Sequence, residues 1–503
     1  MEKEGQLFNE YMSRSSSEVR QKMSGLTEEM ISQATPAAVL KNFHFAAEKV
    51  PAYKKFLKEN KINPEKIISL KDFESVPLTT KENYLSKYPL QELIVDGDFS
   101  KITSITSSSG SSGNPFYWPR SIEQDFGIVS ANEAIYLDNF EIDKKTTLHL
   151  TALGMGVWTG GDGMSMSAKM FAQKGYPFVS INTGLDLKTN MTVLKDLGRY
   201  FDQVIITLYP SFATDIVNSA AEYGLDWKKL KLKFYFGGEP FAEEWRDYIS
   251  EKIFAENKYK DVCSVFGSSE GGAAGVETSL CIYVRQECKK NPKLNIELFN
   301  DTRSPSIVQY NPLGKYFESV KGELVLTTVN GLPLIRYNTR DAGSVNSLSV
   351  FLQALKKAGL DPENDLKKAG CTINWQLPIL YLFGRSDTTA SIYGLNIYPE
   401  NIRSGLSGRG IQELVSGRFF LETINKRAKQ ILQISVELQK GRKVTDNNTA
   451  SVKKSLVAAL RRNNSEYNKL CESVGAKADP VIILVKHGSD QFKTENKLKF
   501  VRK

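Results

Sequence analysis

Apolar and polar positions divide the middle of the chain into short strands that alternate with helices. Apolar side chains recur at helical spacing in residues 191–200, 212–223 and 243–257. Short runs rich in β-branched and aromatic residues predict strands at Thr147–Thr151, Val204–Leu208, Lys233–Phe236, Val262–Phe266 and Glu323–Val329. Strands interleaved with helices in this way predict an α/β fold built on a largely parallel sheet.

The two ends of the chain follow different patterns. The first hundred or so residues predict helices joined by polar loops, with a Thr-capped helix after residues 76–81. Residues 345–368 predict one inserted helix. Beyond residue 387 the elements are smaller and more charged, with strands at 433–438 and 481–485 and a helix at 450–461. We therefore predict a large N-terminal domain, residues 1–386, and a small α+β domain, residues 387–503.

Composition is that of a globular protein and weakens several functional classes. The chain has 503 residues, 41% apolar and 24% charged, and a formal net charge of +9. The basic excess favours anionic ligands weakly, and no nucleic-acid-binding motif accompanies it. No apolar stretch reaches the roughly twenty residues of a membrane span, and the polar N-terminus does not resemble a secretory signal. Five cysteines, sparse and odd in number, predict reduced thiols in a cytoplasmic protein, with a metal site as the minority alternative.

The stretch SSSGSSGNP, residues 107–115, is the strongest chemical signal in the chain. Its glycines allow backbone N–H groups to turn toward one point, and its serine hydroxyls add donors, a combination that suits phosphate. A flexible linker is the alternative. Asn114 stands where a Walker loop has lysine, and Thr159 stands where a dinucleotide fingerprint beginning at Gly154 requires its third glycine. The stretch therefore predicts a phosphate site of another kind.

Four further segments follow the serine stretch in order along the chain. They are YFGGEPF (235–241), VFGSSEGG (265–272), GELVLTTVNGLPLIRYNTRDAG (322–343) and YLFGRSDTTASIYGLNIYP (381–399). Together these segments resemble the adenylate-forming superfamily of acyl-CoA synthetases, peptide-synthetase adenylation domains and luciferases. The branch that they resemble most is the phenylacetate–CoA ligase family, for which residues 208–226 are also typical. The resemblance implies a large domain with mixed and parallel sheets and a small, mobile C-terminal domain.

The resemblance also implies a reaction. A carboxylic acid, of an aryl or medium apolar type, would react with ATP to give an acyl-adenylate and pyrophosphate, and then pass to the thiol of coenzyme A. A carrier protein or an amine is the alternative acceptor. A nucleotide-binding protein that has lost catalysis is a third reading, because Asn114, Phe266, Arg340 and Asn496 depart from the usual motifs. The implied ligands are ATP, Mg²⁺, coenzyme A and a small acid, with no nucleic acid and no membrane span, and a homodimer is left open.

Site residues follow from the resemblance, position by position. The β- and γ-phosphates would be held by Ser108, Ser109, Gly110, Ser111, Ser112 and Gly113. The rest of the nucleotide would be held by Gly237, Gly238, Glu239, Pro240, Phe266, Gly267, Ser268, Ser269, Asp341 and Arg385. The acyl pocket would include His149, Trp158 and Phe236.

Two carboxylates and a lysine have more specific implied roles. Glu270 corresponds to the glutamate that binds Mg²⁺, a hard cation that prefers oxygen ligands. Asp387 corresponds to the hinge between the two domains. Lys497 aligns with the catalytic lysine near the C-terminus, and Lys493 and Lys499 compete for that assignment.

Overall fold

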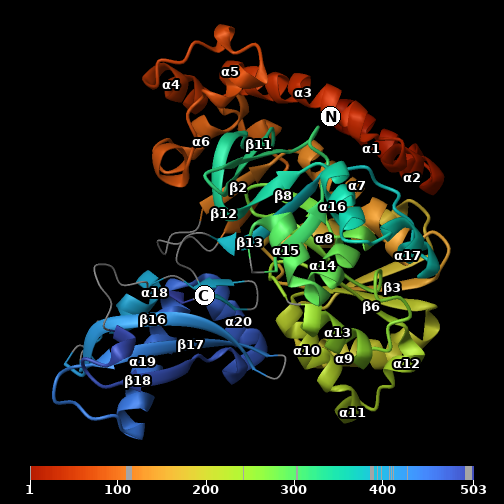
Figure 1. The fold of residues 1–503 in the computed structure, drawn as a ribbon. Helices are drawn as coiled ribbons and strands as arrows, with labels where there is room; N and C mark the ends of the chain where they lie inside the picture. The colour runs from red at the N-terminus through yellow and green to blue at the C-terminus, as the bar shows by residue number, and fades with distance from the viewer. Residues whose placement is uncertain are drawn as a thin grey trace.

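The protein was analysed as a computed structural model. It describes residues 2–108, 116–241, 243–301, 304–385, 390–392, 395–397, 399–406, 408, 410–411, 413–426, 429–492 and 501–502. Helices of the N-terminal segment cover one end of the molecule, and the C-terminal segment, in blue, forms a separate body beside the large central part (Figure 1).

The N-terminal segment is helical, as predicted. Its helices are α1 (Glu2–Ser13), α2 (Ser16–Ser24), α3 (Glu28–Lys49), α4 (Pro51–Glu59), α5 (Leu70–Glu74) and α6 (Leu90–Leu93). The buried face of α3 includes Val39, Phe43 and Ala46, at helical spacing. Thr80 caps a short π-helix, Lys81–Leu85, through a reciprocal pair of hydrogen bonds with Asn83. The predicted Thr-capped helix is thereby confirmed, although its hydrogen bonds are of the π type.

One mixed sheet organises the large domain. Among the described residues it has eleven strands in the order β10-β11-β12-β13-β9-β8-β7-β6-β5-β3-β4. Their bounds are β3 (Thr147–Ala152), β4 (Phe178–Asn182), β5 (Gln203–Leu208), β6 (Leu232–Phe236), β7 (Val262–Ser268), β8 (Gly272–Val276), β9 (Ser306–Gln309), β10 (Tyr316–Val320), β11 (Glu323–Thr328), β12 (Leu334–Asn346) and β13 (Ile379–Arg385). Strands β3 to β7 are parallel, as predicted, and the other half is antiparallel.

Helices connect and cover the strands. They are α7 (Ile122–Phe140), α8 (Thr159–Gln173), α9 (Leu187–Leu197), α10 (Pro210–Asn218), α11 (Ala220–Tyr223), α12 (Trp227–Leu230), α13 (Glu243–Lys252), α14 (Ser279–Lys290), α15 (Pro292–Phe299), α16 (Leu348–Lys357) and α17 (Pro362–Lys368). The prediction of one helix over residues 345–368 was wrong. Gly359, at φ +78°, ends the first helix, and Asp361 caps a second one that starts with Pro362.

The C-terminal body has its own sheet. Among the described residues this sheet has four strands, β16 (Val415–Lys426), β17 (Lys429–Leu438), β18 (Val481–Val485) and β19 (Val501–Arg502). A hairpin, β14 (Ala390–Ile392) and β15 (Leu395–Ile397), precedes it, and α18 (Pro399–Leu406), α19 (Asp446–Asn463) and α20 (Ser465–Val474) accompany it. The strands and helix predicted beyond residue 430 are confirmed. The boundary at residues 386–387 stays a prediction, because residues 386–389 lie outside the described ones.

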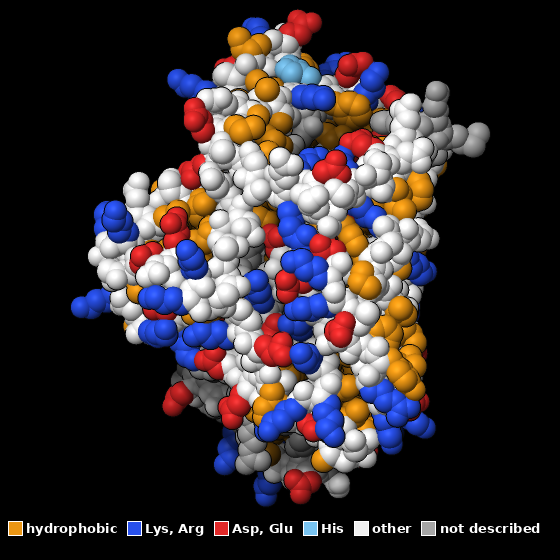
Figure 2. Space-filling view, turned by 90° about the vertical axis from the view of Figure 1, so that its right-hand side faces the viewer, with side chains coloured by type: hydrophobic (Ala, Val, Ile, Leu, Met, Phe, Trp, Pro, Cys, Tyr) orange, Lys and Arg blue, Asp and Glu red, His pale blue; other side chains and the backbone are white. Residues whose placement is uncertain are grey.

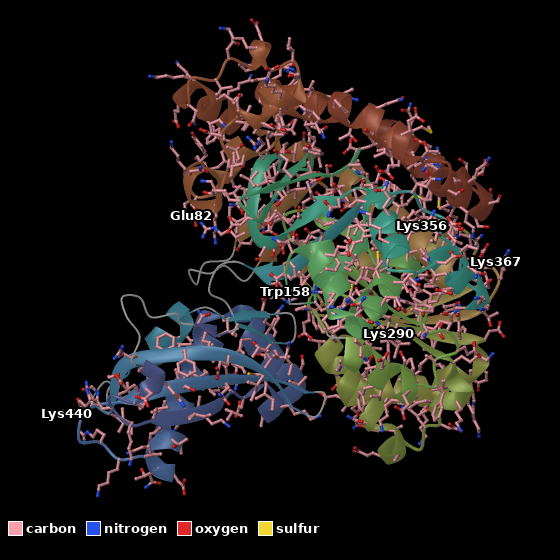
Figure 3. The ribbon with its side chains drawn as sticks, viewed as in Figure 1. Glu82, Trp158, Lys290, Lys356, Lys367 and Lys440 are labelled. Atoms are coloured by element: carbon pink, nitrogen blue, oxygen red, sulfur yellow. The ribbon has the colours of Figure 1, made fainter. Side chains whose placement is uncertain are left out.

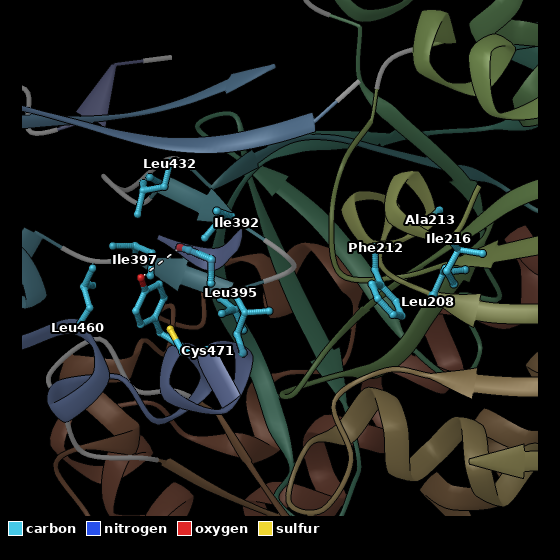
Figure 4. Packing of buried hydrophobic residues seen from close by; sticks show 14 of the residues in the cluster. Leu208, Phe212, Ala213, Ile216, Ile392, Leu395, Ile397, Leu432, Leu460 and Cys471 are labelled. Carbon is cyan, nitrogen blue, oxygen red and sulfur yellow. Dashed lines mark hydrogen bonds between the residues drawn. The ribbon is translucent and has the colours of Figure 1, made fainter. Parts of the chain in front are cut away.

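Buried apolar side chains continue from the large domain into the small one. Phe212 and Ile216 of α10 belong to the same cluster as Ile392 and Leu432 of the C-terminal strands (Figure 4). Burial of apolar surface stabilises such a junction by roughly 25 cal/mol per Å². The two domains are therefore packed against each other in this arrangement.

The N-terminal segment is attached to the sheet beside β12. The Thr79 amide donates to the Arg336 carbonyl at 3.0 Å, and the Asn338 amide donates to the Thr79 carbonyl at 2.9 Å. The Arg336 guanidinium, which pairs with Glu318, also donates to the Val76 carbonyl at 2.6 Å. These bonds bring the π-helix of the N-terminal segment next to the later part of β12.

Candidate functional site

A cavity of about 820 Å³ lies where the parallel strands end and the two domains meet. In open α/β sheets, ligands bind outside the carboxyl ends of the strands. The cavity brings together predicted nucleotide-site residues that are far apart in the sequence: Gly237, Gly238, Glu239, Pro240, Phe266, Gly267, Ser268, Ser269, Glu270 and Asp341. Trp158, predicted for the acyl pocket, also lines it, at the junction of the domains (Figure 3).

The turn after β6 is supported by a buried network of charges. Gly238 takes φ +79°, a conformation that glycine adopts without strain. Just beyond the turn, the Arg285 guanidinium donates to the Phe241 carbonyl and pairs with Glu277 at 2.9 Å, while Arg246 pairs with Glu243 at 2.9 Å. Burial would raise the pKa of Glu243, but the two arginines hold it below its ordinary value. The network fixes the end of the turn against α13 and α14.

Glu270 occupies the tip of the hairpin formed by β7 and β8. The Gly271 amide donates to the Ser268 hydroxyl at 3.1 Å, and the Asn330 side chain donates to the Glu270 carbonyl at 3.4 Å. Lys315 donates to the Ala273 carbonyl at 2.7 Å, and burial, with the charge of Arg120, lowers the pKa of Lys315 to about 8. The hairpin tip is thus held from two sides, with the Glu270 residue at the cavity wall.

Glu270 fits a magnesium site of a particular kind. No cluster of three or more His, Cys, Asp or Glu residues suited to a metal occurs among the described residues. Mg²⁺ is commonly held by one or two carboxylates together with substrate phosphates and water. A single carboxylate at the wall of a nucleotide-sized cavity matches that requirement. The described cysteines, Cys263, Cys281, Cys288, Cys371 and Cys471, are buried and free.

Five successive residues of β12, from Tyr337 to Asp341, line the cavity. Side chains of a regular strand alternate between its faces. Arg340, however, takes φ +61°, in the left-handed region that favours glycine, and both Arg340 and Asp341 line the cavity. The Arg340 guanidinium reaches Glu82 of the π-helix at 2.6 Å. Arg340 therefore takes a backbone conformation that glycine favours, and its side chain ties the N-terminal segment to the strand of Asp341.

The first two residues of the serine stretch, Ser107 and Ser108, end a strand beside the cavity. Strands β1 (Ser104–Ser108) and β2 (Phe116–Arg120) pair in antiparallel fashion, with Ser108 opposite Phe116. The Ser107 amide donates to the Val157 carbonyl at 2.8 Å, and both Ser107 and Phe116 line the cavity. Ser109, Gly110, Ser111, Ser112 and Gly113 lie outside the described residues, so the phosphate site stays a prediction.

The predicted C-terminal lysines and the predicted hinge residue also remain untested, whereas Arg385 is described through its backbone. Lys497, together with Lys493 and Lys499, lies outside the described residues, and so does Asp387. The backbone of Arg385 pairs with that of Asp341 across β13 and β12, so these two predicted nucleotide-site residues are neighbours in the large sheet.

The predicted acyl pocket requires a correction. Phe236 and His149 are fully buried and are not among the described residues that line the cavity. Their places in the wall are taken by Tyr235, one residue earlier on β6, and by Thr207, whose hydroxyl lies 2.9 Å from the His149 Nε2 atom. The face of β6 that meets the cavity differs by one residue from the predicted face.

Burial of His149 predicts a loss of stability in acid. Burial lowers the pKa of His149 to about 3, so it is neutral in the folded protein, while the unfolded chain binds a proton below about pH 6.5. The folded state therefore loses about 1.4 kcal/mol per pH unit between these two values relative to a variant without the histidine. Urea unfolding at about pH 7.5 and about pH 5.5 should show this loss in the wild type and not in His149→Gln. His44→Gln, which removes an exposed histidine, is the control and should lose as much stability in acid as the wild type. An equal loss of stability in the wild type and in His149→Gln would contradict this assignment.

Sequence reasoning missed the parts of the cavity wall that come from the N-terminal segment and from the small domain. Lys81 and Glu82 come from the N-terminal segment, and Glu466 and Lys469 come from α20 of the C-terminal domain. The Lys469 ammonium lies 5.6 Å from the centre of the Trp158 ring, within the range of a cation–π contact. The only sequence signal for Lys81 was its place after the Thr80 cap, and α20 carried no signal for a site.

The surface and the helices add two observations. Basic and acidic side chains are interspersed on the face shown in Figure 2. Along the part of the chain that the structure describes, no helix combines the length and apolar character required to cross a bilayer.

Comparisons with known proteins found one similar sequence and several similar structures. No protein-family model matches the chain. A phenylacetate-coenzyme A ligase from Thermus thermophilus is 24% identical over 390 residues, which cover 77% of this chain and 76% of that protein. A crystal structure of 2-hydroxyisobutyryl-CoA ligase with 2-HIB-AMP and CoA, in the thioesterification state, aligns with a TM-score of 0.61 at 17% identity, covering 96% of this chain and 91% of that one. An open conformation of the same ligase gives a TM-score of 0.53 at 17% identity, with coverages of 95% and 92%.

Fold and site together define the class of this protein: it has the fold of the adenylate-forming enzymes. Within the superfamily its sequence is similar to a phenylacetate-coenzyme A ligase. The family resemblance carried by the five sequence segments is thereby confirmed.

Proposed function

We propose that the protein is an AMP-forming acid–thiol ligase that activates a carboxylic acid with ATP and transfers the acyl group to coenzyme A. The observation that carries this proposal is the convergence of the Gly237–Pro240 turn, Glu270 and Asp341 on one cavity at the ends of the parallel strands. The similarity to a phenylacetate-coenzyme A ligase supports coenzyme A as the acceptor.

The proposed reaction has two steps. A carboxylate oxygen attacks the α-phosphorus of ATP and pyrophosphate leaves, which gives the acyl-adenylate. The thiolate sulfur of the acceptor then attacks the acyl carbon, and AMP leaves with the former carboxylate oxygen. The first step brings two anions together, so cationic and hydrogen-bonding groups around them lower the barrier.

Residues of this chain are proposed to divide the work as follows. The turn Gly237–Pro240 and Phe266 hold the adenine, and the Asp341 carboxylate accepts hydrogen bonds from the ribose hydroxyls. The serine loop, Ser108–Gly113, holds the β- and γ-phosphates with its N–H and O–H donors. Glu270 would hold Mg²⁺, which would supply positive charge to the phosphates. Arg385 is proposed to contact the ribose or the phosphates.

The small domain is proposed to serve both steps by rotating about Asp387. In one orientation Lys497 would reach the α-phosphate and the carboxylate. In the arrangement described here, α20 faces the cavity instead, through Glu466 and Lys469. Rotation about a hinge allows one active site to present two faces of a domain.

Pyrophosphate release with a panel of carboxylic acids tests this function. Each acid is supplied with ATP and Mg²⁺, with and without coenzyme A, and the acyl product is identified by mass spectrometry. Release that depends on both acid and ATP, with formation of an acyl-CoA, is the expected result. Release without thioester would favour the carrier-protein or amine alternative. The absence of release with every acid, by protein that still binds ATP, would favour the alternative of a nucleotide-binding protein without catalysis.

A further inference from the structure

The cavity wall combines apolar side chains with a buried polar pair, Asn132 and Tyr235, which we call the floor. Ile128, Met164 and Trp158 provide apolar wall, and Gly163 leaves space between them. Asn132 of α7 and Tyr235 of β6 also line the cavity. Asn132 is only 4% exposed, and Tyr235 is fully buried. Polar groups placed in an otherwise apolar pocket commonly fix the orientation and identity of the ligand.

The hydrogen bonds of Asn132 and Tyr235 leave one donor and one acceptor position toward a ligand. The Tyr235 hydroxyl donates to the Asn132 Oδ1 atom at 3.1 Å, which uses its only hydrogen. The Asn132 Nδ2 atom donates to the Ser167 hydroxyl at 3.0 Å, which uses one of its two hydrogens. The second N–H of Asn132 and a lone pair of the Tyr235 oxygen remain. An adjacent donor and acceptor are complementary to a hydroxyl group, which accepts from one and donates to the other.

The Thr207 hydroxyl, which also lines the cavity, is already hydrogen-bonded to core residues. The Thr207 hydroxyl lies 2.8 Å from the Tyr136 hydroxyl and 2.9 Å from the His149 Nε2 atom, so its donor and acceptor capacity is directed into the core. Asn132 and Tyr235 therefore differ from Thr207 because together they retain an N–H donor and a lone pair that no described residue uses.

From this arrangement we propose that the substrate acid carries a hydroxyl group at the end remote from its carboxylate, bound by Asn132 and Tyr235. The apolar walls favour an aryl ring between the two polar ends of such an acid. This inference rests on the proposed function, because it takes the carboxylate to lie at the nucleotide end of the cavity. A parent acid without the hydroxyl would leave the buried Asn132 N–H unpaired, which costs affinity.

Matched acids test the inference on the full-length protein. The probes are phenylacetate, benzoate and cinnamate, each with its ring-hydroxylated and ring-methoxylated counterparts. Binding is measured by calorimetry and turnover by pyrophosphate release. We expect at least one hydroxylated acid to bind about ten- to hundredfold more tightly than both its parent and its methoxy counterpart, because a methoxy group accepts but cannot donate. Equal or weaker binding of every hydroxylated acid would overturn the inference.

Variants locate the preference in the floor. Asn132→Leu should abolish the preference for the hydroxylated acid while the parent still binds, and Ser165→Ala, which removes a buried hydroxyl of α8 outside the described cavity wall, should leave the ratio between the two acids unchanged. A preference that survives Asn132→Leu would contradict the assignment. The wild-type comparison needs no variant, so it decides the matter even if Asn132→Leu fails to fold. Failure of the proposed function is distinguished by a binding preference that is present without any pyrophosphate release.

Discussion

Glu270→Gln should lower magnesium-dependent pyrophosphate release by about 10²- to 10³-fold, the usual cost of removing one well-placed electrostatic group from an active site. The residue lies at the tip of the β7–β8 hairpin, at the wall of the cavity, and glutamine keeps its size while removing its charge. The variant should require more Mg²⁺ for half-maximal rate, because a neutral amide is a weaker ligand for a hard cation. Initial rates over a range of Mg²⁺ concentrations measure both effects.

Glu297→Gln is the matched control, since Glu297 is exposed on α15 and outside the described cavity wall. Its rate should equal that of the wild type, and both variants should retain the wild-type circular dichroism spectrum. Near-normal turnover and an unchanged Mg²⁺ requirement in Glu270→Gln would remove Glu270 from the mechanism.

Lys497→Ala should block the first step and spare the second. A lysine cation between the approaching carboxylate and the α-phosphate lowers their repulsion, and its loss should slow acyl-adenylate formation by about 10²- to 10³-fold. The same variant should still convert a supplied acyl-adenylate to the thioester, because that step is proposed to use the other orientation of the small domain. Single-turnover assays that follow the adenylate and the thioester separately test the two halves.

Lys493→Ala and Lys499→Ala are the controls for this assignment. If one of these variants, and not Lys497→Ala, loses adenylate formation selectively, the alignment of the C-terminal segment is shifted. If all three variants form the adenylate at the wild-type rate, the segment has no part in the first step.

Local patterns predicted the strands and helices well where neighbouring residues determine them. The strand at Val481–Val485 has the predicted bounds, and the predicted strands of the large domain agree within a few residues with β3, β5, β6, β7 and β11. Helix α13 ends earlier than predicted, at Lys252, because Phe254 takes φ +55° two residues later. A left-handed residue of that kind leaves no mark in hydrophobic periodicity. Hydrophobic periodicity alone did not indicate the antiparallel half of the large sheet, because pairing between distant strands is not a local property, and only the family resemblance implied a mixed sheet.

The cavity brings together more of the residues predicted for the nucleotide than of those predicted for the acyl group. Glycine-rich turns and acidic residues keep their order along the chain, and the cavity brings Gly238, Glu270 and Asp341 together as predicted. For the acyl pocket, the choice between Tyr235 and Phe236 depends on which face of β6 is turned to the cavity, and a shift of one residue reverses that choice. The contact of Lys469 with Trp158 depends on how two domains dock, which no local pattern records.

The most direct test of acid activation through an adenylate follows one oxygen atom. The substrate acid is labelled with oxygen-18 in its carboxylate, the reaction is run with ATP and coenzyme A, and the nucleotide products are analysed by mass spectrometry. Attack of the carboxylate on the α-phosphorus predicts AMP that carries one oxygen-18 atom, together with unlabelled pyrophosphate. Unlabelled AMP, or ADP with labelled phosphate, would contradict the proposed chemistry.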